Sequence, residues 1–123
     1  MVVMVVDDSQ FMRNSVKKCF AELQIPCIAI EAMDGEDALV KLGDTKPELI
    51  LLDWNMPKLL GIDFLKRVRA DSRYKNLPII MVTSESSRLN IIEALKSGAT
   101  DYILKPITAK LLKEKLVYIF GTI

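Results

Sequence analysis

Five short apolar runs, separated by longer segments with helical periodicity, constrain the fold of this chain more than any other feature. The runs cover residues 2–6, 27–32, 49–52, 79–82 and 102–104. Three of them are almost wholly apolar, which is typical of strands that are buried on both faces of a parallel sheet. The pattern therefore predicts five consecutive units, each a β-strand followed by an α-helix.

The segments between the runs carry apolar residues at helical spacing, and several begin with residues that cap helices. The five predicted helices begin near Ser9, Asp34, Gly61, Ser86 and Thr108. The fourth is expected to cover residues 86–97 and to end at Gly98, and the fifth to cover residues 108–120. This α/β alternation with right-handed crossovers predicts an open, doubly wound, five-stranded parallel sheet.

Composition limits what such a chain does. With 123 residues, of which 50% are hydrophobic, residues 1–123 are expected to form one domain with no room for an output domain. Positive and negative charges are interspersed and sum to +1, so neither nucleic acid nor a membrane surface is indicated as a partner. The apolar opening is too short for a signal peptide or a membrane span, which favours a cytoplasmic protein.

Polar residues stand where the predicted strands end, and ligands of doubly wound sheets bind at that edge. Asp7 and Asp8 follow the first strand, Asp53 the third, Thr83 the fourth and Lys105 the fifth. Three neighbouring carboxylates repel one another unless a cation binds or one of them is protonated. Because the ligands are oxygens and the chain has no histidine, Mg²⁺ is favoured over Zn²⁺ or Cu²⁺.

The same residues suit phosphoryl transfer. A Mg²⁺ ion that bridges Asp53 and an incoming phosphoryl oxygen provides the arrangement that this reaction needs. Lys105 supplies a positive charge for a second oxygen, and the Thr83 hydroxyl supplies a hydrogen-bond donor for a third. Asp53 is then the expected nucleophile and forms an aspartyl phosphate.

Four separated motifs resemble those of the response-regulator receiver family. They are VVDDS at residues 5–9, LLDWNMP at 51–57, MVTSE at 81–85 and YILKP at 102–106. The resemblance covers essentially the whole chain and is strongest with the chemotaxis-type members. It implies the flavodoxin-like strand order 2-1-3-4-5 and a signalling receiver that phosphorylates and dephosphorylates itself rather than an enzyme with an external substrate.

The resemblance also implies a metal site and a site of modification. Asp8 and Asp53 would bind Mg²⁺ together with the backbone carbonyl of Asn55, and Asp7 would act directly or through water. Asp53 would accept the phosphoryl group from a histidine kinase, since the chain has no histidine of its own.

Further positions match parts of the family's switch. Thr83 and Tyr102 match the pair in which the hydroxyl moves toward the phosphoryl group and the aromatic ring turns into the space that it leaves. Asn55 and Glu85 match positions that tune hydrolysis of the phosphoryl group. The Lys105–Pro106 bond matches one that is typically cis.

One stretch departs from the family pattern. After the proline of the third motif, the family usually has Met-Asp-Gly, whereas this chain has Leu59, Leu60 and Gly61. An acidic residue outside the catalytic set is therefore replaced by an apolar one. This exchange is expected to leave the chemistry intact and to offer a hydrophobic contact to a particular kinase or phosphatase.

The output of the chain stays open at this stage. The resemblance implies a monomer with the flagellar motor switch as its downstream partner, and a phosphatase is a further expected partner. A phosphorelay intermediate and an allosteric kinase regulator are alternatives within the family. A hydrolase of external aspartyl phosphates needs a second acid two residues after its nucleophile, but Asn55 stands there in this chain. A flavin carrier needs a phosphate-binding loop after the first strand, which this chain lacks.

Overall fold

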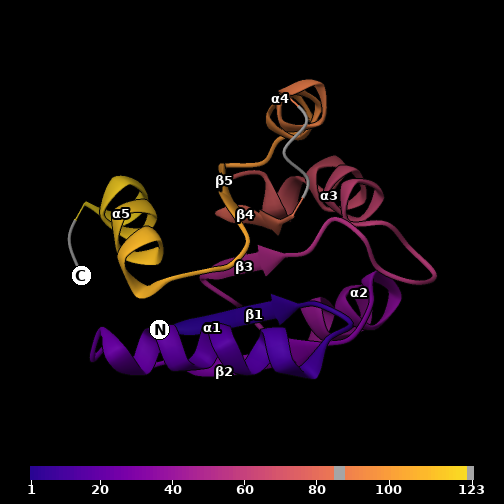
Figure 1. The fold of residues 1–123 in the computed structure, drawn as a ribbon. Coiled ribbons are helices and arrows are strands. Elements are labelled where there is room, and N and C mark those ends of the chain that lie inside the picture. The colour runs from indigo at the N-terminus through magenta and orange to yellow at the C-terminus, as the bar shows by residue number, and fades with distance from the viewer. Residues whose placement is uncertain (85–87, 122–123) are drawn as a thin grey trace.

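The computed structural model describes residues 1–84 and 88–121, which form a parallel sheet with helices on both faces (Figure 1). The strands are β1 Val2–Val6, β2 Ile28–Ala32, β3 Leu49–Leu52, β4 Ile79–Thr83 and β5 Asp101–Leu104. The helices are α1 Gln10–Glu22, α2 Gly35–Asp44, α3 Gly61–Ala70, α4 Arg88–Lys96 and α5 Ala109–Phe120, with a short 3₁₀ helix η1 at Ser72–Tyr74.

The strands lie in the order β2-β1-β3-β4-β5, and every neighbouring pair is parallel. The predicted fold class and strand order are therefore confirmed. Small differences occur at the ends: β2 begins at Ile28, β4 continues to Thr83 and β5 begins at Asp101. The predicted helix start near Ser86 lies outside the described residues, and the sequence pattern did not predict η1.

Helix capping follows the sequence closely. The side chains of Ser9, Asp34 and Thr108 accept hydrogen bonds from the third backbone N–H that follows each of them, so α1, α2 and α5 are capped. Helix α3 differs, because its N-cap residue is Leu60, whose side chain accepts no hydrogen bond.

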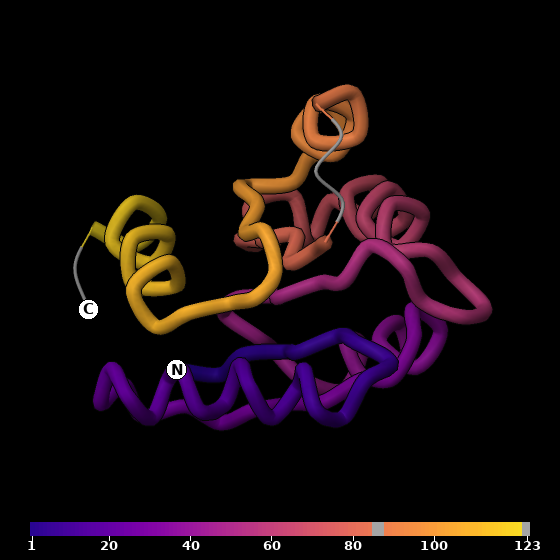
Figure 2. The backbone as a smooth tube through the Cα atoms, in the orientation of Figure 1, coloured from indigo at the N-terminus to yellow at the C-terminus, as the bar shows by residue number. Residues whose placement is uncertain are grey.

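The alternation of side chains along the strands divides the core between the two faces of the sheet. In β1, Val3 and Val5 pack with residues of α1 and α5, whereas Met4 and Val6 pack with residues of α2, α3 and α4. Figure 2 shows α5 on one side of the sheet and α2 and α3 on the other. None of the helices within the described residues has the length and apolar character needed to span a membrane.

Arg69 joins three elements on the α3 side. Its Nε donates to the Gly98 carbonyl at 2.8 Å and its Nη1 to the Tyr74 carbonyl at 2.6 Å. Burial lowers the pKa of this guanidinium. Arg69 thus holds α3, η1 and the turn between α4 and β5 together.

Candidate functional site

Three carboxylates meet at the carboxyl edge of the sheet. One oxygen from each of Asp7, Asp8 and Asp53 lies within 4.8 Å of the other two, and Asp7 and Asp53 are buried while Asp8 is exposed. The backbone is fixed at both buried positions, since the Asp7 N–H donates to the Ala32 carbonyl and the Asp53 N–H to the Val6 carbonyl. The neighbouring strands β1 and β3 therefore bring together residues that are 46 positions apart.

Lys105 lies against two of these carboxylates. Its ammonium group is 3.1 Å from Asp7 Oδ2 and 3.1 Å from Asp53 Oδ1. The Lys105 N–H donates to the Thr83 carbonyl, which fixes its backbone beside the end of β4. The Lys105–Pro106 peptide bond is cis, the form implied by the family resemblance. Burial by itself favours the neutral amine, but the hydrogen bonds to Asp53 and Asp7 prevail and raise the pKa of Lys105.

The charge balance of the cluster is negative. Burial and the nearby Asp7 carboxylate raise the pKa of Asp53 above its ordinary value, and Lys105 only partly offsets them. Ionised Asp53 is therefore less stable here than in water. Carboxylate oxygens at this spacing are suitable ligands for a hard divalent cation, which would relieve the repulsion that one lysine leaves.

Two residues that the sequence analysis missed position Asp7. The Arg13 Nη1 donates to the Asp7 carbonyl at 2.7 Å, and its Nε lies 3.1 Å from Glu31 on β2. The Ser9 N–H donates to Asp7 Oδ1 at 2.9 Å. Helix periodicity assigns Arg13 only to the polar side of α1, so no sequence signal identified this contact.

The other predicted site residues lie around this cluster. Asn55 is exposed in the loop after β3, and Thr83 is the buried last residue of β4. Tyr102 is half-buried on β5, and both Thr83 and Tyr102 line a cavity of about 10 Å³ with Trp54. Glu85 lies outside the described residues.

The loop after β3 packs tightly on the start of α2. Leu59 is buried, and a Cβ atom added at Gly35 would lie 2.8 Å from the Leu59 Cβ. Lys58 adopts a left-handed backbone conformation with φ of 68°. Its ammonium group lies 3.8 Å from Oδ2 of the buried Asp34. Leu60, which replaces the usual acidic residue, is 44% exposed. The loop that carries Asn55 is thus held in place while Leu60 faces solvent.

The chain is similar to chemotaxis proteins from several bacteria. The chain is 45% identical to chemotaxis protein CheY1 of Helicobacter pylori over 99% of this chain and 98% of the relative. It is 45% identical to chemotaxis protein CheY of Pseudomonas aeruginosa over 98% of this chain and 96% of the relative.

Two solved structures share the fold. Vibrio cholerae CheY4 has a TM-score of 0.85 and 34% identity, over 96% of this chain and 97% of that chain. The CheX–CheY–BeF3–Mg complex from Borrelia burgdorferi has a TM-score of 0.88 and 27% identity, over 98% of this chain and 89% of that chain. The response regulator receiver domain model matches residues 3–117. The chain therefore belongs to the response regulator receiver family.

Proposed function

We propose that this receiver accepts a phosphoryl group on Asp53 and controls the binding of a protein partner in chemotaxis. The observation that carries the proposal is the contact of Lys105 with both Asp7 and Asp53, inside a cluster of three carboxylates. Two buried carboxylates and a partly buried ammonium group that lies 3.1 Å from each of them form a site that can balance charge as it changes during a reaction. The chemotaxis assignment is supported by the CheY relatives.

Each residue of the cluster has a proposed part. Asp53 offers a carboxylate oxygen to the phosphorus of the donor phosphohistidine, whose bond to nitrogen breaks as the new bond to oxygen forms. Lys105 turns from Asp53 to a phosphoryl oxygen, and the Thr83 hydroxyl donates to another. Asp8, Asp53 and the Asn55 carbonyl would hold Mg²⁺, with Asp7 acting directly or through water, and the bound ion would supply positive charge for the phosphoryl oxygens.

Metal binding is tested by titration of the chain with Mg²⁺. Trp54 adjoins Asp53, so its emission should change with the metal. At a hundredfold excess over the dissociation constant the fold should gain about 2.7 kcal/mol. Asp8→Ala should remove this gain. If millimolar Mg²⁺ changes neither the melting temperature nor the Trp54 emission, the proposed metal site is wrong.

Phosphorylation is tested with acetyl phosphate, a small donor that needs no kinase. Labelling should require Mg²⁺, because the groups that position and neutralise the phosphoryl group reside in the receiver. Asp53→Asn should not be labelled, and Lys105→Ala should be labelled more slowly. Peptide mapping that finds the phosphoryl group on a serine or threonine would refute the assignment to Asp53.

The proposed switch depends on Thr83 and Tyr102. They line one cavity of about 10 Å³, which is too small for an aromatic ring. Movement of Thr83 toward a phosphoryl group would enlarge this space and allow Tyr102 to turn inward. Lys115 lies 5.4 Å from the centre of the Tyr102 ring and 3.0 Å from Asp101, so the ring also contacts α5.

The proposed output surface consists of α4, β5 and α5. Large apolar side chains are exposed on each of these elements, among them Leu89, Leu104 and Tyr118. Thr83 ends the strand that precedes α4 and Lys105 follows β5, so a phosphoryl group that draws in both residues acts on the whole surface. A typical coupling of about 1 to 3 kcal/mol would change the affinity of a partner roughly 5- to 150-fold.

The partners follow from the same role. A histidine kinase would supply the phosphoryl group, the flagellar motor switch is the proposed target, and a phosphatase is a third proposed partner. The chain is proposed to act as a monomer. Affinity for the motor switch would be compared with and without beryllofluoride, in the parent and in Thr83→Ala, Tyr102→Ala and Lys113→Ala. Unchanged affinity on activation, or a footprint confined to α2, would instead favour a phosphorelay intermediate or a kinase regulator.

A further inference from the structure

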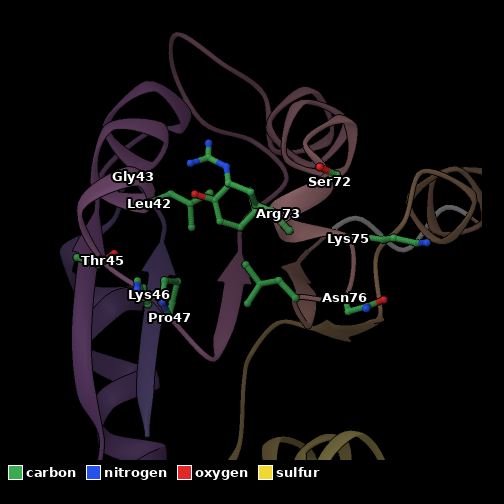
Figure 3. A pocket seen from close by; sticks show the side chains of 11 residues that line it. Leu42, Gly43, Thr45, Lys46, Pro47, Ser72, Arg73, Lys75 and Asn76 are labelled. Atoms are coloured by element: carbon green, nitrogen blue, oxygen red, sulfur yellow. The ribbon is translucent and has the colours of Figure 1, made fainter.

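A second pocket lies at the edge of the sheet opposite to Asp53. It has a volume of about 510 Å³ and lies between the C-terminal end of α2 with its following loop and the segment 72–77 (Figure 3). Pro47 precedes β3 and Leu77 precedes β4, whereas Asp53 and Thr83 stand at the other ends of these strands. Asp53 stands six positions after Pro47, which at the rise of an extended strand is a separation of about 20 Å. The pocket is therefore distinct from the phosphorylation site.

The interior of the pocket is apolar. Its lining includes Leu42 and Pro47, which are buried, and Tyr74 and Leu77, which are partly buried. A volume of this size is in the range of sites that hold small molecules, of about 300 to 1,000 Å³. The four side chains offer a surface that suits a planar apolar group.

The rim of the pocket is cationic. Lys46, Arg73 and Lys75 contribute to the lining, and no carboxylate does so among the described residues. The Lys46 and Lys75 ammonium groups have no ion-pair partner within the described part of the chain. Figure 3 shows Lys46 beside Pro47 on one wall and Lys75 directed outward on the other, so Lys46 is the better placed of the two.

The guanidinium of Arg73 is positioned to bind an anion. Its Nε and Nη2 donate to Asp71, and its guanidinium lies 5.1 Å from the centre of the Tyr74 ring. Its Nη1 has no acceptor among the described residues, so it can donate to a ligand without loss of the Asp71 contact. Asp71 does not line the pocket, and neither does Asp44 at the end of α2.

Both walls are fixed before any ligand binds. The carbonyl of Tyr74 accepts from Arg69 at 2.6 Å, and the Tyr74 N–H donates to the Asp71 carbonyl. On the other wall, the hydroxyl and the N–H of Thr45 both donate to the Lys41 carbonyl. A pocket with fixed walls requires little reorganisation when a ligand enters.

We propose that this pocket binds a planar aromatic anion, with its ring against Leu42, Tyr74 and Leu77 and its anionic group at Lys46 and Arg73. A carboxylate, sulfonate or phosphate matches the planar donor arrangement of arginine. An uncharged aromatic compound cannot form the ionic contact with Lys46 and Arg73, so it binds more weakly.

The test uses 1-anilinonaphthalene-8-sulfonate with the full chain, and its uncharged analogue N-phenyl-1-naphthylamine as the matched probe. The sulfonate should bind saturably with one site and shift the backbone amide resonances of residues 42–47 and 72–77. Lys46→Met should weaken binding about two- to fivefold, as for removal of one exposed ion pair. Lys18→Met on α1 removes the same charge from an exposed position away from the pocket and should leave binding unchanged.

Gly43→Leu blocks the pocket without a clash. Gly43 lines the pocket, and a Cβ atom there would meet no heavy atom within 4 Å, so the wall can accommodate a larger side chain that narrows the space for a ligand. Stability should be unchanged or higher, since leucine favours a helix more than glycine does, while binding of the sulfonate is lost. The proposal is overturned by undiminished binding to Gly43→Leu or Lys46→Met, by equal binding of the uncharged analogue, or by resonance shifts centred elsewhere.

Discussion

Gly61, the first residue of α3, lies so close to the carbonyl oxygen of Asp53 that a Cβ atom has no room there. The Gly61 N–H also donates to the Trp54 carbonyl at 2.9 Å. Helix α3 therefore begins directly on the backbone of the proposed phosphoryl acceptor. The position of Asp53 depends on the absence of a side chain eight residues later.

Gly61→Ala should destabilise the fold and weaken Mg²⁺ binding together. The added methyl group displaces the backbone of Asp53, and such overpacking costs about 1 to 3 kcal/mol. Chemical denaturation measures the first effect and Trp54 emission the second. Gly43→Ala is the control, because that position is open and the helix should gain about 0.5 to 1 kcal/mol. Equal stability and equal metal affinity of the two variants would contradict the contact.

Asp53→Asn should stabilise the metal-free fold at pH 7. The pKa of Asp53 is raised above its ordinary value of 3.8, so the folded state holds the proton more tightly than the unfolded chain does. Ionised Asp53 therefore lowers the free energy of unfolding, and the parent recovers stability as the pH falls through the folded pKa. The difference between variant and parent, measured by denaturation in EDTA, should shrink toward pH 4. A difference that grows on acidification would reverse the assigned sign.

Leu60→Asp should stabilise the protein by about 1 kcal/mol, because the new side chain can cap α3 where leucine cannot. Leu60→Asn provides the cap without a further negative charge near the carboxylate cluster. The asparagine variant should therefore gain at least as much in the absence of Mg²⁺. Urea denaturation of the parent and the two variants measures the free energy of unfolding. If neither variant is more stable than the parent, the N-terminus of α3 needs no cap.

Arg69→Met should cost about 1.5 to 3 kcal/mol, the usual range for hydrogen bonds to a charged group. The carbonyls of Gly98 and Tyr74 would both lose their donor. Arg67→Met is the matched control, since Arg67 is exposed on the same helix. Similar midpoints for the two variants in thermal denaturation would mean that Arg69 does not hold the elements together.

The sequence by itself determined the fold class and most of the site. Apolar runs that alternate with helical segments are typical of a helix-covered parallel sheet, and polar residues that follow parallel strands share one edge of that sheet. Asp7, Asp53 and Lys105 were identified in this way because each directly follows a strand. The helix caps Ser9, Asp34 and Thr108 could also be predicted from the sequence, since capping depends only on residues that are close in the chain.

Only the tertiary structure decided how distant segments fit together. Arg13 on the carbonyl of Asp7, Arg69 on that of Gly98 and Gly61 against Asp53 all depend on the placement of a helix relative to the sheet. No local pattern encodes such a placement, because it is set by side-chain packing between elements far apart in the chain. The pocket at Lys46 and Tyr74 exists for the same reason: its two walls meet only after β3 and β4 have paired.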